Sequence, residues 1–353
     1  MEFDFRKMIV GEENLEEVLC ASSERMREVA AEIRLYAPLD FPILIEGDSG
    51  TGKELVARAL HDLSGRRPSP FLAINIAEGS DTLFESNLFG HKKGAFTGAD
   101  HARPGIIEQA MDGTLFLDEI NSLSKSLQPK LLRVLEEKVY WPVGATAPVS
   151  TSARFLFSTN QKLAKMTDNG QFREDVMYRL GRTIRLPLLR ERQEDIPALA
   201  KRLIAESSRK IFESISRRQG ESGAWNANFK TPPVLSEGAL LKMRSYPWPG
   251  NIREMKVVVE RAVLVCRNKT ILPEHIEFPY ATETRLEKYD AALETFSQGY
   301  FSRVLDLAGE NFRLGMLLTG MSETSYRRKI RKYRKNKMRD RNEKYESDEG
   351  EDS

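Results

Sequence analysis

The sequence predicts an α/β fold, in which a parallel sheet has helices on both faces and an all-helical region follows. From about residue 10 to 187, short apolar segments alternate with amphipathic segments of helical length. This alternation is typical of parallel strands joined by crossover helices. From Asp195 to about residue 280, apolar residues instead recur at the 3.6-residue spacing of helices. A glycine-rich loop between the first strand and its helix is a third indication of this fold.

Each predicted element has its own pattern. Continuous apolar runs predict five buried strands: Ile43–Glu46, Leu72–Ile76, Thr114–Leu117, Phe155–Ser158 and Thr183–Leu186. Amphipathic spacing predicts four helices among them: Leu15–Tyr36, Glu54–Leu63, Leu127–Glu137 and Glu174–Leu180. In the helical region the periodic apolar positions are Ile196, Leu199, Ala200, Leu203 and Ile204, and later Met255, Val258, Val259, Ala262 and Val263. The polar segment Gly220–Pro233 is predicted to be a loop.

Bulk properties are those of a globular chain with two or three domains. The chain has 353 residues, of which 40% are hydrophobic and 30% charged, and its net charge of +2 does not identify a partner. Cys20 and Cys266 lie far apart, which favours a reducing compartment over a disulfide scaffold. The four scattered histidines form no metal-ligand pattern, and no signal peptide or membrane-spanning run is found. We therefore expect a cytoplasmic chain.

The glycine-rich loop predicts a site for a nucleoside triphosphate. It fits G-x-x-x-x-G-K, known as Walker A, and lies between an apolar strand and a helix, as this motif requires. Its backbone N–H groups can surround phosphate oxygens, while the lysine reaches the β and γ phosphates. The alternative is a glycine-rich turn with a solvated lysine. The residues expected to bind ATP are Gly47, Asp48, Ser49, Gly50, Thr51, Gly52, Lys53 and the adjoining Glu54.

Glu54 stands where this motif usually has serine or threonine, the hydroxyl ligand of Mg²⁺. That ligand is therefore missing, or is replaced by Thr51 or by water. A second acidic segment follows the apolar run Leu115–Leu117, and such a carboxylate lies where open α/β sheets bind ligands. We expect Asp118 to hold Mg²⁺ and Glu119 to act as the general base for the attacking water. The alternative is a carboxylate pair that only caps the following helix.

Between these two motifs lies a glycine-flanked loop whose composition suits a mobile contact surface. Its residues Gly94, Ala95, Phe96, Thr97, Gly98 and Ala99 form a segment that resembles the signature loop of the sigma-54-dependent transcriptional activators. These are AAA+ ATPases of the NtrC type, and the resemblance extends from about Val10 to Tyr333. It implies that the loop contacts the sigma-54 factor of RNA polymerase and moves with the nucleotide state. We assign that contact mainly to Phe96 and Thr97.

The resemblance also implies roles for polar residues at strand and helix ends. Asn160, with Thr159 second, corresponds to sensor I, and Asn75 to the asparagine that switches the catalytic glutamate. The alternative for Asn75 is a simple strand-end cap. Arg173 and Arg179 match the arginine-finger segment, whose side chains stabilise charge on a neighbouring subunit's γ-phosphoryl group.

Without that context the two arginines would be expected to pair with Glu174 or Asp175 on the surface. The segment Tyr246–Glu254 resembles sensor II, in which Arg253 points to the nucleotide of its own subunit. Departures from the family pattern are Asn87 and Lys92, where glutamate is usual. The loss of two acidic residues beside the loop puts the strength of its coupling to the nucleotide in question.

The segment Glu310–Tyr333 resembles the Fis-type helix-turn-helix of these activators. Asn311–Leu318 would be the supporting helix and Ser322–Tyr333 the recognition helix, although Gly315-Met316 replaces two alanines. A dense basic block at the end of this segment matches the footprint of phosphate contact, whereas the alternative is a solvated basic helix offset by an acidic tail. The expected DNA-contacting residues are Ser322, Thr324, Ser325, Tyr326, Arg327, Arg328, Lys329 and Lys332.

The expected domains are an ATPase α/β subdomain at 1–190, a helical lid at 191–280, a linker at 281–289, the helix-turn-helix at 290–337 and an acidic tail at 338–353. The resemblance implies an ATP- and Mg²⁺-dependent activator that assembles into a ring, as a hexamer, and acts at the nucleoid. Its partners would be sigma-54 RNA polymerase and double-stranded DNA upstream of the promoter. Because the chain begins almost directly with the ATPase, we expect control by a regulatory protein acting in trans. The alternative is a DNA-binding regulator that uses ATP as a switch with little turnover.

Overall fold

The computed structural model describes residues 11–78, 80–96, 98–219, 231–267, 269–279, 297, 300–301, 304–305, 307–309 and 311–331. The chain divides into two compact units, Met1–Pro279 and Tyr280–Ser353. The predicted acidic tail and Lys332 lie outside the described residues, as do Glu310 and Thr97. Among the helices that are described, none is both long and apolar enough to cross a bilayer.

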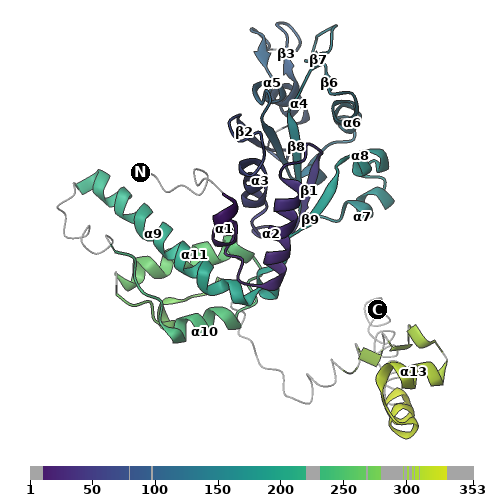
Figure 1. Ribbon diagram of the computed structural model, residues 1–353, viewed down its shortest axis with the longest axis vertical. Coiled ribbons are helices and arrows are strands. Elements are labelled where there is room, and N and C mark those ends of the chain that lie inside the picture. Colours follow the sequence, from purple (N-terminus) through teal and green to yellow (C-terminus); the bar gives the residue numbers. More distant parts are fainter. Residues whose placement is uncertain are drawn as a thin grey trace, which may run out of the picture. The chain divides into compact units, whose positions relative to one another are not determined.

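A five-stranded parallel sheet forms the centre of the first unit (Figure 1). Its strands, in spatial order, are β2 (Phe71–Asn75), β5 (Thr114–Asp118), β8 (Arg154–Thr159), β1 (Ile43–Glu46) and β9 (Arg182–Arg185). Every neighbouring pair runs parallel. The predicted α/β fold with a parallel sheet is therefore confirmed.

Helices cover both faces of this sheet because successive strand residues point to opposite sides. On β5, Leu115 and Leu117 enter one core cluster, whereas Phe116 enters the other. The first cluster is covered by α4 (Asp81–Phe89), α5 (Ile106–Gln109), α6 (Gln128–Glu137), α7 (Leu163–Asp168) and α8 (Glu174–Arg179). The second is covered by α1 (Leu15–Leu19), α2 (Glu24–Tyr36) and α3 (Lys53–Asp62), which Figure 1 shows on the opposite side of the strands.

The prediction of a single helix over Leu15–Tyr36 is wrong, since the first helix ends at Leu19 and a second begins at Glu24. Cys20 adopts a left-handed conformation with φ of 51°, which ends α1. The hydroxyl of Ser23 then accepts a hydrogen bond from Met26 N and starts α2. The end of α1 could not be predicted from the sequence, because glycine or asparagine rather than cysteine usually adopts the left-handed conformation at a helix end.

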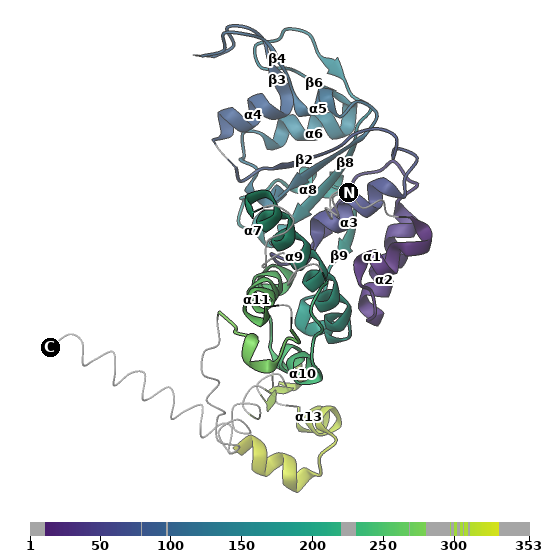
Figure 2. The ribbon, with the colours of Figure 1, turned by 90° about the vertical axis from the view of Figure 1, so that its left-hand side faces the viewer.

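Two small hairpins extend from the end of the sheet near α4 and α6 (Figure 2). One pairs β3 (Gly90–His91) with β4 (Arg103–Pro104), and the other pairs β6 (Val139–Tyr140) with β7 (Val149–Ser150). The hairpins are joined through Val143, which donates to Gly90 O at 2.8 Å and accepts from Lys92 N at 3.0 Å. They therefore behave as one surface element.

The rest of the first unit is helical, as predicted, and packs around its own core. It comprises η4 (Leu189–Glu191), η5 (Gln193–Asp195), α9 (Ile196–Gln219), α10 (Glu237–Ser245), α11 (Asn251–Cys266) and η7 (Pro273–His275). The fully buried Trp248 lies in this core, and its indole N–H donates to Met243 O at 2.8 Å. Most of the predicted loop Gly220–Pro233 lies outside the described residues.

In the second unit, α13 (Phe312–Thr319) is capped by the Asn311 side chain and ends at Gly320, whose φ is 63°. Residues 323–331 form a second helix. Tyr326 is only 2% exposed, and a Cβ atom on Gly315 would overlap its hydroxyl group. Glycine at 315 is therefore the partner of a bulky Tyr326, which accounts for one departure from the family pattern. Because it is buried, we expect Tyr326 to support the helix rather than contact DNA, contrary to the sequence prediction.

Gly181 shows how closely the sheet is packed. Its φ is 90°, and a Cβ atom there would overlap the carbonyl oxygen of Pro42. Gly170 also has a positive φ, of 63°, but nothing lies within 4 Å of its Cβ position. We expect Gly181→Ala to lower the free energy of unfolding by about 3 kcal/mol or more, and Gly170→Ala by about 1 kcal/mol, the strain of the left-handed backbone alone. Urea unfolding of both variants tests this, and equal losses would contradict it.

Candidate nucleotide site and contact loop

The loop Gly47–Gly52 joins β1 to the first residue of α3. Gly50 and Gly52 have φ values of 79° and 107°, in the left-handed region that favours glycine. Since α3 begins at Lys53, the unpaired N–H groups of its first turn follow the loop directly. Backbone donors and the positive end of a helix thus come together, the arrangement that binds phosphate.

The Lys53 ammonium group lies over this loop. Its Nζ donates to Gly47 O at 2.7 Å and to Asp48 O at 3.2 Å. Burial lowers the pKa of Lys53, while the nearby carboxylates of Asp118 and Glu119 act in the opposite direction. The loop, the lysine and the two carboxylates therefore lie close enough to act on one another electrostatically.

Asp118 and Glu119 lie at the carboxyl end of β5, beside β8. The hydroxyl of Ser158 on β8 donates to Asp118 Oδ1 and accepts from Glu119 N, the latter at 3.1 Å. Glu119 has φ of 60°, which is uncommon for a residue with a side chain and recurs at functional sites. Ser158 was missed from the sequence because its role depends on β8 being the neighbour of β5.

Thr51 is a poor replacement for the missing hydroxyl ligand. Its side chain is 2% exposed, and Oγ1 donates to Asp48 O at 2.8 Å. No cluster of three or more metal-ligating side chains occurs among the residues that the structure describes. Asp118, oriented by Ser158, fits a Mg²⁺ ion that takes its remaining ligands from phosphate and water, as Mg²⁺ often does.

The predicted sensor I residue, Asn160, and the predicted switch residue, Asn75, have different surroundings. Asn160 Oδ1, at the end of β8, is buried and meets no hydrogen-bond donor within the described part of the chain. A buried acceptor of this kind calls for a donor such as a bound water, whereas the predicted contact with the γ-phosphate would have to be made by the Asn160 amide N–H₂ group. Asn75 Oδ1 instead accepts from Ala77 N at 2.8 Å, the strand-end cap that was its alternative. No hydrogen bond between Asn75 and Glu119 occurs in the described structure.

The predicted sensor II segment contacts the phosphate-binding loop directly. Arg253 Nη1 donates to Ser49 Oγ, and Ile252 N donates to Gly50 O at 2.9 Å. A Cβ atom on Gly50 would lie 2.6 Å from Gly250 O. The helical subdomain is thus seated on the loop itself, which places the Arg253 guanidinium at the phosphate site.

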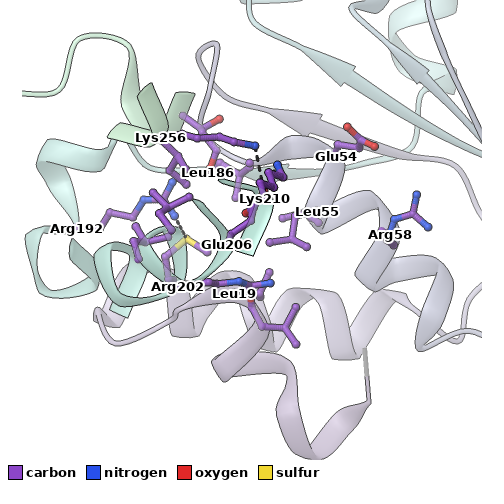
Figure 3. Close-up of a pocket in the computed structure, with 18 of the residues that line it drawn as sticks. Leu19, Glu54, Leu55, Arg58, Leu186, Arg192, Arg202, Glu206, Lys210 and Lys256 are labelled. Atoms are coloured by element: carbon purple, nitrogen blue, oxygen red, sulfur yellow. Dashed lines mark hydrogen bonds and ion pairs between the residues drawn. The ribbon is translucent and has the colours of Figure 1, made fainter. Parts of the chain in front are cut away.

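Beside the loop lies a cavity of about 580 Å³ between α3 and the helical subdomain (Figure 3). Leu19, Leu55, Leu186, Leu203 and Ile252 provide apolar walls. On its α9 side Glu206 pairs with Lys210 at 2.5 Å and with Lys256 at 3.3 Å. A cavity of this size with apolar walls and polar rims can accept a nucleoside next to bound phosphates.

The predicted contact loop, Gly94–Ala99, lies in the connection between β3 and β4 of the first hairpin. Gly94 and Gly98 have φ of 80° and 95°, and Gly94 N donates to Ala99 O at 2.9 Å, which closes the loop. Phe96 is 36% exposed, and its ring meets that of His91 edge-on at 5.0 Å. The structure thus presents a large aromatic side chain on a protruding hairpin.

Comparison with known proteins decides the family. Residues 19–185 match the sigma-54 interaction domain, and residues 222–292 match the AAA+ ATPase lid domain. The sigma-54-dependent transcriptional activator SfnR of Pseudomonas putida is 40% identical over 285 residues, which cover 80% of this chain and 73% of SfnR. The chain belongs to the sigma-54-dependent transcriptional activators.

Two further regulatory proteins and one solved structure are also similar to this chain. The Nif-specific regulatory protein of Azotobacter vinelandii is 40% identical over 76% of this chain, and the chain spans 48% of that protein. NtrC of Rhizobium meliloti is 40% identical, with 78% and 53% covered. The structure of NtrX from Brucella abortus in complex with ATP has a TM-score of 0.62 at 28% identity, covering 94% of this chain and 70% of NtrX. The chain thus spans about half the length of several activators that it matches.

The two arginines predicted to act as fingers lie on the surface. Arg173 forms a two-pronged pair with Asp175, at 3.0 and 2.7 Å, and Arg179 pairs with Glu136 at 2.9 Å. Their side chains remain 50% and 59% exposed. Exposed pairs of this kind contribute little stability, so both side chains are free to turn to another partner.

Asn87 and Lys92, the two departures from the family pattern near the contact loop, have different surroundings. Lys92 belongs to the stem of the contact loop, and its backbone N–H holds Val143 O. Its side chain is exposed, whereas Asn87 lies half-buried in the last turn of α4. The backbone contacts of the stem therefore form without the two usual glutamates.

The site predicts separate effects for its two central residues. Lys53→Ala removes the charge over the loop and should weaken ATP binding by at least about tenfold. Glu119→Gln keeps size and polarity but removes the base, so binding should persist while hydrolysis falls by about 100-fold or more. Fluorescent-nucleotide binding and phosphate release measure the two, with Glu108→Gln on α5 as control. Hydrolysis by Glu119→Gln at the unchanged rate would contradict the assignment.

Proposed function

We propose that this chain hydrolyses ATP and uses the reaction to remodel sigma-54 RNA polymerase from the closed to the open promoter complex. The observation that carries the proposal is one continuous path between the two sites. β2 ends at Asn75 beside Asp118, α4 follows from Asp81 to Phe89, and the contact loop begins at the next strand. A short helix is a rigid connector, so movement at the sheet end can be passed to the loop.

In the reaction the loop amides and Lys53 would bind the phosphates, and Glu119 would take a proton from the water that attacks the γ-phosphorus. The products are ADP and inorganic phosphate. Bound Mg²⁺, held through Asp118, would neutralise charge on the β and γ phosphates. Asn160 would sense the γ-phosphate, and Arg253 would bind it from the helical lid. Each of these groups lies at the loop or at the strand ends beside it.

The contact with sigma-54 is assigned to the loop tip at Phe96 and Thr97. Exposed Phe96 on a closed hairpin supplies an apolar anchor of the kind that protein interfaces use. We expect Thr97→Ala to hydrolyse ATP within about twofold of the unchanged chain, because Thr97 belongs to neither nucleotide-binding motif of the sequence, but to lose open-complex formation. Thr82→Ala, an exposed threonine on α4, is the control. Open complexes formed at the normal level by Thr97→Ala would remove the loop from the account.

Arg173 and Arg179 are proposed to act on the nucleotide of a neighbouring copy, so that the active form is a ring, a hexamer by family expectation. Their exposure supports this reading. Specific ATPase activity should then rise with protein concentration as rings assemble, and Arg173→Ala should fall by about 1000-fold at every concentration. Specific activity that is the same at all concentrations, with Arg173→Ala unaffected, would mean that each copy works alone.

The second unit is proposed to bind double-stranded DNA upstream of the promoter. Its second helix has an exposed face that includes Thr324, Arg327, Arg328 and Arg331, with Ser322 at its start. Such a basic helix on a small apolar core supports phosphate contact. Binding to an upstream site should weaken steeply with salt, and a chain ending at Pro279 that binds as tightly as the full chain would refute the assignment.

The alternative is a DNA-binding regulator with little ATP turnover, which the departures at Asn87 and Lys92 favour. Nucleotide binding without measurable hydrolysis at any protein concentration would select it. We also propose that a regulatory protein acts on the chain in trans in the bacterial cytoplasm. ATPase activity that no candidate regulator changes would count against that part.

A further inference from the structure

The carbonyl groups of the phosphate-binding loop are held from outside by the helical subdomain and the segment that leads to it. Ser49 O accepts from Asn251 Nδ2 at 3.1 Å, Gly50 O from Ile252 N at 2.9 Å, and Thr51 O from Arg192 Nη2 at 2.7 Å. Three successive carbonyls are therefore bound by groups that lie more than 140 residues away in sequence. Ile252 donates through its backbone N–H group, so Asn251 and Arg192 are the two residues whose side chains hold the loop.

Both side chains are fixed by further contacts. Asn251 is 1% exposed, and its Oδ1 accepts from Leu189 N at 2.9 Å, so it bridges the loop and the segment after β9. Arg192 is also 1% exposed, and its Nη1 lies 3.0 Å from Met26 Sδ. The neighbouring Asp195 accepts from Ser23 N and Oγ, at 2.6 and 2.9 Å, which ties this segment to the start of α2.

The direction of these carbonyls sets the direction of the amides. In a planar trans peptide, the C=O of one residue and the N–H of the next point in opposite directions. When the carbonyls of Ser49 and Thr51 point toward the lid, the N–H groups of Gly50 and Gly52 point away from it. Across the described residues these two N–H groups meet no acceptor, which leaves them for phosphate oxygens.

We propose that Arg192 and Asn251 are positioning residues, which align the phosphate-binding amides by holding the loop carbonyls from the lid side. The proposal rests on the proposed ATPase function and adds to it. The Arg253 side chain would contact the nucleotide, whereas Arg192 and Asn251 would prepare the loop before the nucleotide arrives. Their loss should therefore weaken binding of ADP as well as ATP, because ADP uses the same amides.

Arg154 offers a matched control for the removal of Arg192, because it is another buried arginine that donates to backbone carbonyl groups. Arg154 is likewise 1% exposed, has an Nε atom without a partner, and donates through Nη1 and Nη2 to Ala37 O and Tyr36 O, at 2.7 and 2.9 Å. Those carbonyls end α2 and do not belong to the phosphate-binding loop. Arg154→Met and Arg192→Met thus remove the same kind of interaction from two different places.

The experiment is titration of a fluorescent ADP analogue into the full chain, with urea unfolding of each variant alongside. The account predicts that Arg192→Met raises the dissociation constant about tenfold or more, the effect of one charge-assisted hydrogen bond, while Arg154→Met stays within about twofold. Loss of stability alone does not change the dissociation constant while most molecules stay folded. Equal dissociation constants for both variants, whether normal or raised, would overturn the proposal.

If Arg192→Met does not fold, the dissociation constant of the ADP analogue is measured for Asn251→Gly instead, and it should again be raised. Asn251 has φ of 52°, which glycine adopts without strain, so this change removes the side-chain bridge and little else. An unchanged dissociation constant in Asn251→Gly would then overturn the proposal. Absence of binding by the unchanged chain would instead refute the ATPase function on which it rests.

Discussion

The structure depends on how closely the helical lid is seated on the phosphate-binding loop. At Gly50 the lid backbone comes so near that a side chain could not fit, since Gly250 O would lie 2.6 Å from its Cβ atom. The same contact puts Arg253 beside Ser49 and closes one wall of the cavity next to α3. The nucleotide site is thus formed by both subdomains of the first unit, and a change in lid position must change the site.

The order of the strands explains which polar residues meet at the edge of the sheet. Because β5 lies between β2 and β8, the ends of these strands bring Asn75, Asp118 and Ser158 to one edge. The chain that leaves β2 passes through α4 into the hairpin that carries the contact loop, and Val143 fixes this hairpin to the next one. The sheet edge with Asp118 and the hairpin with Phe96 are therefore connected through α4, and this connection would be the physical basis of the proposed coupling between ATP hydrolysis and the contact loop.

Much of this organisation could be predicted because its signals are local. The strands, the glycine-rich loop and the acidic pair each carry their pattern within a few residues, and Lys53, Asp118 and Glu119 do come together. Ser158, Arg192 and Asn251 could not be assigned to these contacts, since their partners follow from strand order and from the path of the chain after β9. The pairing of Gly315 with Tyr326 shows the same limit, because a glycine that looks like a departure becomes necessary only when the neighbouring helix is in place.

The central claim is that ATP hydrolysis, rather than ATP binding alone, drives the action of this chain on sigma-54 RNA polymerase. The most direct test is to measure strand opening at a sigma-54 promoter with purified chain and polymerase, comparing ATP with a non-hydrolysable analogue. The account predicts open complexes with ATP and only closed complexes with the analogue. Equal opening with both nucleotides would contradict it, and so would closed complexes that persist while ATP is being hydrolysed.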